Sequence, residues 1–351
     1  MKRKRIFRRL NLTLLIFLAL IIILGGGYTA WNAAGPEKTC NSCHEINPSY
    51  DTWAASAHRD VKCHYCHGTA MSNGWHSLTE KSGMLFSHFN SNVRSDDIGL
   101  SEEQFLETMD RCKTCHQTEY ASWKSSGHSA TYADIFLDEV HNSTERLNFD
   151  CLRCHGMFYE GTTNDLVEPI SLEGPWTLVD ESKADHPVIP CMACHTIHST
   201  GYPAMEPDHS DPGNIFYGRK IENNSIGFYS RHEKFHFSLD QLPTPVMMLK
   251  NDTVKAPEDM VYRLCVQCHA PSVWHQAGQG DDRTPTGVHE GIGCRACHER
   301  HTNNQRNLCS SCHPAISNCN IDVKLMNTTY NSPESPNDIH SVACNDCHDE
   351  I

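Results

Sequence analysis

The sequence predicts short α-helices and long coil with almost no sheet, behind one N-terminal transmembrane helix. Two observations predict this class. Hydrophobic residues make up only 38% of the 351 residues, and that share includes the cysteines and the apolar N-terminal segment. Side chains alone would therefore bury too little apolar surface to offset the conformational entropy lost on folding. Eighteen of the 19 cysteines recur in one motif, which indicates that covalently attached groups fill the interior instead.

The motif C-x-x-C-H occurs nine times and uses 18 of the 19 cysteines. It is the attachment signature of c-type haem, in which two thiols at i and i+3 bond one porphyrin and the next residue supplies the proximal imidazole. The cysteine pairs are Cys40/Cys43, Cys63/Cys66, Cys112/Cys115, Cys151/Cys154, Cys191/Cys194, Cys265/Cys268, Cys294/Cys297, Cys309/Cys312 and Cys344/Cys347. The proximal histidines are His44, His67, His116, His155, His195, His269, His298, His313 and His348.

Zinc sites and disulfides are the competing interpretations of a cysteine-rich chain. Neither requires a histidine directly after every cysteine pair, and histidine fills that position in all nine copies. The motif therefore favours nine haem c groups, and the predicted fold class is a multihaem cytochrome c. Cys319 lies outside the motifs and has no disulfide partner left within the chain. A buried free thiol is favoured there over a thiolate ligand of iron.

Fifteen histidines remain once the nine proximal ones are assigned, enough to give every iron a second axial ligand. Three patterns rank them: a histidine four or five residues before a motif, a histidine three residues after a proximal one, and an internal repeat. Together they favour seven distal ligands, which are His58, His128, His186, His198, His289, His301 and His340. Two more are expected among His76, His88, His141, His232, His236 and His275. For His64 and His209 a structural role is favoured.

The internal repeat follows two of the motifs. Tyr50, Trp53, Ser56 and His58 follow His44, and the same residue types recur at the same offsets as Tyr120, Trp123, Ser126 and His128. We expect the aromatic rings to pack on porphyrin and the last histidine of each copy to coordinate iron.

The first 30 residues have the pattern of a membrane anchor. Six of the first nine residues are basic, and residues 10–30 contain no charge. At ~1.5 Å per residue this segment would span roughly 31 Å, the thickness of the hydrocarbon core. Basic residues place the N-terminal end in the cytoplasm, so we expect a single-pass protein of the inner membrane with the bulk of the chain in the periplasm. A cleaved signal peptide is the alternative, but no good small-x-small cleavage site precedes Cys40.

The charge of the chain restricts its partners. Beyond the basic tail, 23 basic residues face 43 acidic ones, a net charge of −20. Nucleic acid is excluded as a partner, because binding it requires a cationic surface that displaces counterions. An acidic exported domain suits docking with basic redox proteins.

The spacing of the motifs divides the chain. The predicted parts are a cytoplasmic basic tail at 1–9, a transmembrane anchor at 10–30, a five-haem region at 31–200, an inter-haem insertion at 201–264 and a four-haem region at 265–351. We expect the insertion to be a long surface loop, with a partner surface or a lid over one haem as the alternatives.

Residues 1–90 resemble the NapC/NirT/NrfH family of membrane-anchored quinol dehydrogenases. The resemblance is carried by the basic tail, the single helix and C-x-x-C-H-E-I-N-P-x-Y-x-x-W-x-x-S-x-H at Cys40–His58, followed by a second motif. It implies that menaquinol is oxidised at the membrane face, that the first haem is the entry point, and that electrons pass to periplasmic redox proteins or reductases. One departure is Ile46, because NrfH-type members have there a methionine that ligates the first iron.

Three functions follow as hypotheses. The first is an electron conduit fed by the membrane quinone pool. The second is a reductase of small nitrogen or sulfur compounds at one haem with an open site, which the absence of a C-x-x-C-K motif disfavours. The third is a structural module that bridges other cytochromes.

Overall fold

The computed structural model describes residues 2–33, 41, 44–68, 86, 88–89, 100–144, 146–198, 225–270, 275–280, 282–302, 312–313, 322 and 325–347. The chain divides into two compact units, Met1–Ile98 and Gly99–Ile351. Several residues of the predicted sites lie outside the described residues: Cys40, Cys43, His76, His209, Cys309, Cys319 and His348.

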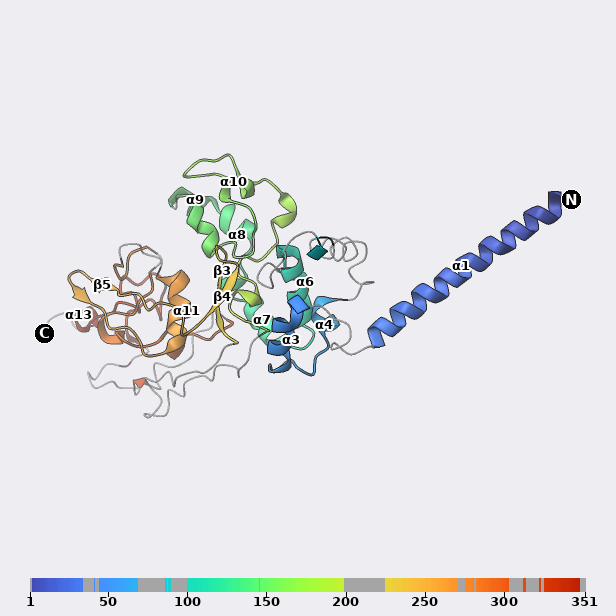
Figure 1. Ribbon diagram of the computed structural model, residues 1–351. Coiled ribbons are helices and arrows are strands. Elements are labelled where there is room, and N and C mark those ends of the chain that lie inside the picture. The colour runs from blue at the N-terminus through green and yellow to red at the C-terminus, as the bar shows by residue number, and fades with distance from the viewer. Residues whose placement is uncertain are drawn as a thin grey trace. The chain divides into compact units, whose positions relative to one another are not determined.

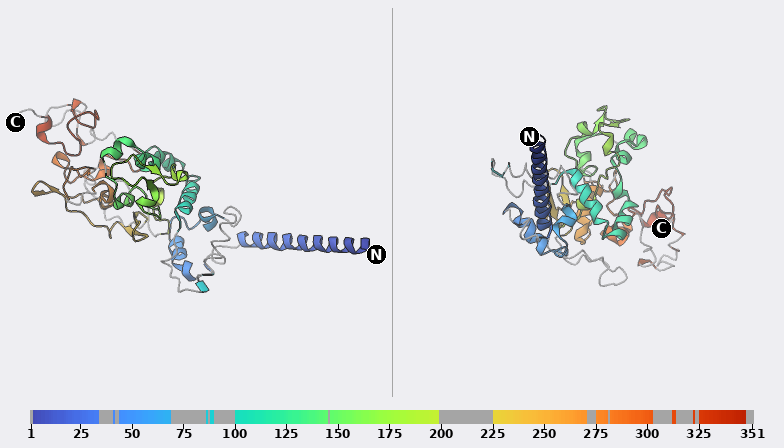
Figure 2. Two further views of the ribbon diagram at one scale, coloured as in Figure 1. Left: turned by 90° about the horizontal axis from the view of Figure 1, so that it is seen from above. Right: turned by 90° about the vertical axis from the view of Figure 1, so that its right-hand side faces the viewer.

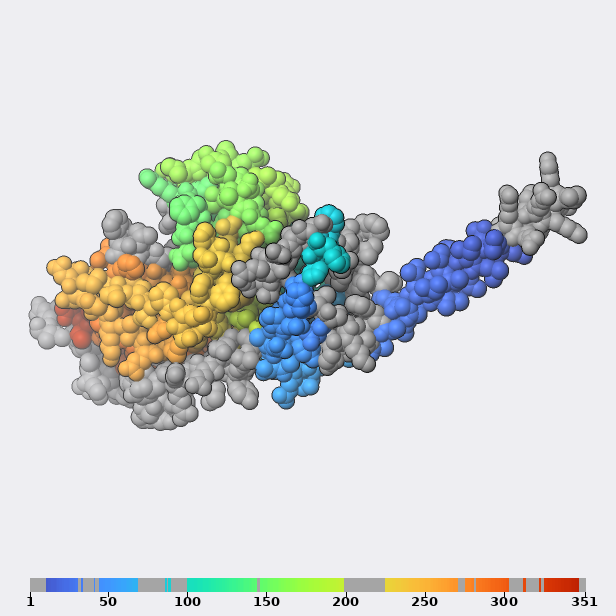
Figure 3. All heavy atoms as spheres, viewed as in Figure 1, coloured from blue at the N-terminus to red at the C-terminus, as the bar shows by residue number. Residues whose placement is uncertain are grey.

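The first unit begins with one long helix, α1 (Lys2–Ala33), which runs without interruption (Figure 2). Its residues Asn11–Ala30 have a mean hydropathy of 2.3, and none of this window is buried within the protein (Figure 3). Within the described part of the chain, α1 is the one helix long and apolar enough to cross a membrane. The predicted anchor at 10–30 is therefore a helix of the required length.

Three short elements follow α1 in the first unit: η1 (His44–Ile46), α3 (Asn47–Ala54) and α4 (Cys63–His67). Pro48 lies in the first turn of α3, where a missing backbone N–H costs nothing. Helix α4 consists of the second motif alone and ends at Gly68.

The second unit contains short helices joined by coil (Figure 1). Its α-helices are α6 (Glu102–Cys112), α7 (Gln117–Lys124), α8 (Tyr132–Phe136), α9 (Glu139–Thr144), α10 (Thr163–Leu166), α11 (Met260–His269) and α13 (Cys344–Cys347). Its 3-10 turns are η3 (Gly127–Ser129), η4 (Phe149–Arg153), η5 (Glu181–Lys183), η6 (Cys191–Ala193), η7 (Gly287–His289) and η8 (Cys294–Ala296).

Sheet is confined, in the residues described, to three antiparallel two-stranded ribbons. These are β1 (Val167–Glu168) with β2 (Thr177–Leu178), β3 (Gly227–Ser230) with β4 (Phe235–Ser238), and β5 (Met248–Leu249) with β6 (Asp252–Thr253). The predicted class of helix and coil with little sheet is confirmed.

Side chains of the second unit form three separate hydrophobic clusters, and each cluster borders motif cysteines. The first joins α8, η4, α10, β1 and β2 and packs against Cys151. The second joins η6, β3 and α11 and packs against Cys194, Cys265 and Cys268. The third contains Tyr262 and Val266 of α11, which are not part of the second cluster, and packs against Cys294. Each cluster therefore contacts at least one motif cysteine.

The expectation of a surface loop at 201–264 is wrong for its described part. Residues 201–224 lie outside the described residues, but 225–264 fold as two hairpins and the start of α11. Phe228 and Leu239 are buried in the second cluster, and Met247 and Val254 in the third. The sequence obscured this because the apolar residues are spread across several short strands rather than along one periodic element.

The compact units do not coincide with the motif-based division of the chain. The boundary falls at 98/99, whereas the predicted five-haem region runs from 31 to 200. That division by motif spacing stays a prediction.

A buried ion pair joins α11 to η8. The carboxylate of Asp259 accepts hydrogen bonds from Arg295 at 2.8 and 2.9 Å, and both side chains are at least nine-tenths buried. Asp259 also caps α11 by accepting from the backbone N–H of Val261 at 3.0 Å. One carboxylate therefore holds the helix of the sixth motif against the turn of the seventh.

We expect the substitution Asp259→Ala to lower the free energy of unfolding by about 3–5 kcal/mol, because it leaves the Arg295 charge buried without a partner. Thermal unfolding of the holoprotein, followed by circular dichroism, measures this. Asp252→Ala, at an exposed position of β6, is the matched control and should stay within ~0.5 kcal/mol of the parent. Equal melting curves for the two variants would contradict the role assigned to Asp259.

Candidate functional site

The described motifs each close one helical turn. In four of them the backbone N–H of the motif histidine donates to the carbonyl oxygen of the first cysteine at 2.9–3.0 Å: His116 to Cys112, His155 to Cys151, His195 to Cys191 and His298 to Cys294. Residues three and four apart lie on the same face of a helical turn. Both thiols and the imidazole of each motif are therefore presented to one side, as attachment of a single porphyrin requires.

Four of the motifs meet in the second unit. The side chains of Cys154 and Cys268 hydrogen bond to each other, and so do those of Cys265 and Cys294. Cys194 interacts electrostatically with Cys265. Motifs four, five, six and seven are therefore neighbours in space, although they are spread along the chain from residue 151 to residue 298.

The motif cysteines differ in how far the chain covers them. Within the part of the chain that the structure describes, no disulfide joins one motif cysteine to another. Both cysteines of the fourth, fifth and sixth motifs are half-buried, and so are Cys63 and Cys66 of the second. Four motif cysteines are exposed: Cys115, Cys297, Cys312 and Cys344.

The exposed thiols lie on turns that the three hydrophobic clusters do not cover. The hydrophobic clusters pack against Cys294, yet they do not reach its motif partner Cys297, and they leave out Cys66, Cys115 and Cys312 as well. The physical reason is that a motif needs only one turn to present its thiols, and such a turn can lie at the surface. Haem attachment at the exposed cysteines Cys115, Cys297, Cys312 and Cys344 stays a prediction, as it does at the other motif cysteines.

Five pairs of described histidine rings each join one motif histidine to one non-motif histidine. In the second unit the ring centroids are 6.1 Å apart for His128 and His269, 5.9 Å for His195 and His301, 6.4 Å for His289 and His313, and 5.9 Å for His298 and His340. In the first unit His44 and His88 are 5.5 Å apart.

Desolvation lowers the pKa of several of the paired imidazoles. It lowers the pKa of His195 to about 4, and electrostatic repulsion from His301 adds to the effect. Burial also lowers the pKa of His128, His298 and His289. An imidazole must be unprotonated to bind a metal, so these side chains are in the state that iron ligation needs.

The residues present fit a c-type haem. The histidine pairs of the second unit have ring centroids 5.9–6.4 Å apart, and the hydrophobic clusters lie beside the cysteines of motifs four to seven.

The predicted internal repeat is also a repeat of structure. Tyr50 and Trp53 have centroids 5.5 Å apart with planes at 45°, and Tyr120 and Trp123 have the same separation at 46°. In both copies the serine hydroxyl donates to the tryptophan carbonyl, at 2.8 Å in the first and 2.7 Å in the second.

The serine of each copy also fixes the histidine. Its hydroxyl accepts from the backbone N–H of His58 at 3.1 Å in the first copy and of His128 at 3.3 Å in the second. Because His128 lies opposite His269, the repeat delivers a histidine to another motif. Packing of the aromatic residues on porphyrin stays a prediction.

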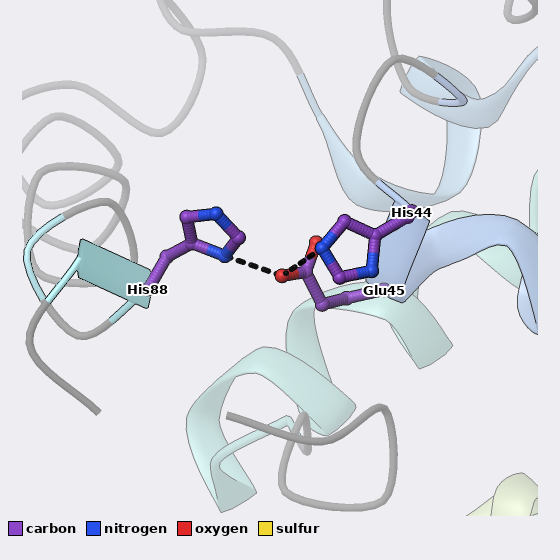
Figure 4. A group of neighbouring side chains, drawn as sticks. All are labelled: His44, Glu45 and His88. Carbon is purple, nitrogen blue, oxygen red and sulfur yellow. Dashed lines mark ion pairs between the residues drawn. The ribbon is translucent and has the colours of Figure 1, made fainter. Parts of the chain in front are cut away.

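Glu45 forms a polar group with His44 and His88 in the first unit (Figure 4). Its carboxylate, 9% exposed, lies 3.2 Å from Nε2 of His44 and contacts Nδ1 of His88. The pKa of Glu45 is lowered, chiefly by a backbone hydrogen bond. Sequence reasoning missed this residue, although an acidic side chain directly after a motif histidine was the available signal.

Other predicted histidines have different surroundings. His236 contacts the carbonyl oxygen of Met192 at 2.5 Å through Nε2, which anchors β4 to the fifth motif. His64 stacks on Tyr65 with centroids 4.9 Å apart, in agreement with a structural role. Nδ1 of His186 is buried without a hydrogen-bond partner.

Comparisons with known proteins agree with the cytochrome chemistry. Residues 2–161 match the model of the NapC/NirT cytochrome c family, N-terminal region, and residues 227–299 match that of cytochrome c554 and c-prime. The cytochrome c-type protein NrfH of Wolinella succinogenes is 26% identical over 142 residues, which cover 37% of this chain and 71% of NrfH. No solved structure matches the chain.

The chain is therefore a multihaem c-type cytochrome, an electron-transfer protein that binds haem covalently. Its N-terminal region is similar to that of the NapC/NirT cytochrome c family. The match to residue 161 extends well beyond residues 1–90, where the sequence suggested the resemblance.

We expect Ser126→Ala to destabilise the second repeat by about 1–3 kcal/mol, because the backbone N–H of His128 loses its acceptor in a buried site. The matched control is Ser125→Ala, whose exposed hydroxyl donates only to the carbonyl of Ser122. Thermal unfolding of both holoproteins measures the difference. A melting temperature equal to that of the control would show that the buried hydroxyl does not hold this segment.

Proposed function

We propose that this cytochrome is a nine-haem electron conduit, anchored in the inner membrane, that oxidises menaquinol and passes electrons to periplasmic redox partners. The observation that carries the proposal lies within the matched residues 2–161. They contain both a helix of membrane-spanning length and the first four motifs.

The chain itself ties the first motif to the membrane face. Cys40 is the seventh residue after the end of α1 at Ala33, and a fully extended chain of seven residue steps spans at most about 25 Å. The first haem would thus lie near the end of the anchor, within reach of a quinol in the bilayer. The resemblance to the NapC/NirT type supports this motif as the point of electron entry.

Onward transfer is supported by the neighbouring motifs of the second unit. Haem supplies reversible one-electron chemistry at iron when it is bound. The residues of this chain would hold each haem by two thiols and offer it imidazole ligands, and the hydrophobic clusters lie beside the cysteines of motifs four to seven. His116 of the third motif interacts electrostatically with His195 of the fifth, so the path extends to that motif too.

The charge of the exported part supports a basic acceptor. Its 43 acidic residues against 23 basic ones produce a negative field that steers cationic partners into encounter. A periplasmic redox protein with a positive docking surface fits this charge.

Quinol reduction of purified full-length holoprotein in detergent tests the proposal. A menaquinol analogue should reduce the haems of the full-length chain, followed by the ferrous absorption bands. A variant lacking residues 2–33 should be reduced much more slowly. Dithionite should reduce both forms equally, which controls for haem content. Equal quinol rates with and without α1, or no reduction of either, would contradict a membrane quinol dehydrogenase.

The alternative of a reductase with an open haem site predicts a different outcome. A substantial high-spin ferric signal that shifts when nitrite or hydroxylamine is added would favour it. The five histidine pairs described above favour irons with two axial imidazoles instead.

A further inference from the structure

We infer a specific axial partner for four haems of the second unit: His301 for the fifth motif, His128 for the sixth, His340 for the seventh and His289 for the eighth. The inference rests on the proposed attachment of haem at these motifs. It goes beyond haem attachment, because it assigns to each of the four irons the histidine that would be its distal axial ligand.

The distance between the rings allows two imidazoles to share one metal ion. Metal–imidazole bonds are about 2 Å long, so two ring centroids on opposite sides of one ion lie about 6 Å apart. The four pairs measure 5.9–6.4 Å. In each pair one ring belongs to a motif and the other does not, as one proximal and one distal ligand require.

Hydrogen bonds orient two of the distal rings. Nδ1 of His289 lies 3.0 Å from the carbonyl oxygen of Ile339, and Nδ1 of His340 lies 3.0 Å from the carboxylate of Asp338. Metal-binding histidines characteristically use their second nitrogen in this way, which fixes the ring and its tautomer. Nε2 of both rings is then the ligating atom.

The backbone holds these two histidines beside each other. The N–H of Thr286 donates to the carbonyl of His340 at 2.7 Å, and that of Val288 donates to Val342 at 3.0 Å. Gly287 lies between Thr286 and Val288 and has a φ angle of +64°, and a Cβ atom at this position would collide with the carbonyl oxygen of Val342. Only glycine permits this close approach.

The pairing couples three haems through one segment. Residues 289–301 would carry the distal ligand of the eighth motif, the whole seventh motif and the distal ligand of the fifth. These three irons would then be fixed relative to one another by thirteen consecutive residues, which favours constant electron-transfer distances between them.

The angle between the rings supplies a spectroscopic test. The rings of His298 and His340 are nearly parallel at 4°, whereas those of His289 and His313 cross at 67°. Parallel imidazoles both interact with the same iron dπ orbital and so separate its energy from that of the other dπ orbital. This energy gap produces a rhombic low-spin ferric EPR signal. Crossed imidazoles leave the two orbitals close in energy and produce a signal with one very large g value.

Single substitutions in the full-length oxidised holoprotein test each partner. His340→Ala should remove one rhombic signal, and His289→Ala one large-g signal, each with the gain of one high-spin haem. His64→Ala, at a histidine that stacks on Tyr65 and lies outside the pairs, should leave the spectrum unchanged. Intact mass should show the same haem number in all three variants. His340→Met should keep a six-coordinate iron and add the near-infrared absorption of histidine–methionine ligation.

The pairing is overturned if His340→Ala and His289→Ala leave every low-spin signal intact, or if each removes the signal expected of the other. The absence of new histidine–methionine absorption in a His340→Met protein with full haem content also overturns it. Either result leaves quinol reduction and haem number unaffected, so failure of the pairing is distinct from failure of the proposed function.

Discussion

The fold of this cytochrome depends on one local constraint, which is that two thiols and an imidazole must meet one flat cofactor from a single helical turn. The motif satisfies it with a spacing of three and four residues, and the described motifs adopt that turn whether they end a helix, as in α11, or stand alone, as in η6. No long element is needed to present five residues. The short helices and long connections follow from this.

The hydrophobic packing is organised around the same points. Three modest clusters replace the single core of an ordinary domain, and all three border motif cysteines. Ion pairs and helix caps then join neighbouring motifs. Asp259, for example, caps the helix of the sixth motif and pairs with Arg295 of the seventh. Because these motifs lie next to one another, the arrangement that stabilises the protein is also the arrangement that would carry electrons.

The sequence predicted the motif turns, the N-terminal helix and the Tyr–Trp–Ser–His repeat, because each depends on a spacing that one segment contains. It did not predict that Phe228 and Met247 are buried, because short strands leave too few residues for a periodicity to appear. It favoured His128, His289, His301 and His340 as distal ligands but could not say which motif each faces. That depends on contacts between segments far apart in sequence, such as His128 and His269.

The His44–Glu45–His88 group is a second case that the sequence did not predict. Glu45 adjoins a motif histidine in sequence, yet its significance depends on a contact with His88, 43 residues further along the chain. The exposure of Cys115 and Cys297 likewise depends on which segments cover a turn. A spacing rule describes what one turn can bind. It does not describe what a second segment brings to that turn.

The central claim is that a haem is bonded to each of the nine cysteine pairs. Intact mass spectrometry of the full-length protein, produced in a host that assembles c-type cytochromes, tests it most directly when combined with a digest that assigns haem to individual peptides. The account predicts a mass above that of the polypeptide by nine haem groups, with one haem on every C-x-x-C-H peptide. A bare polypeptide mass without a Soret band, or motif peptides with free thiols, would contradict it.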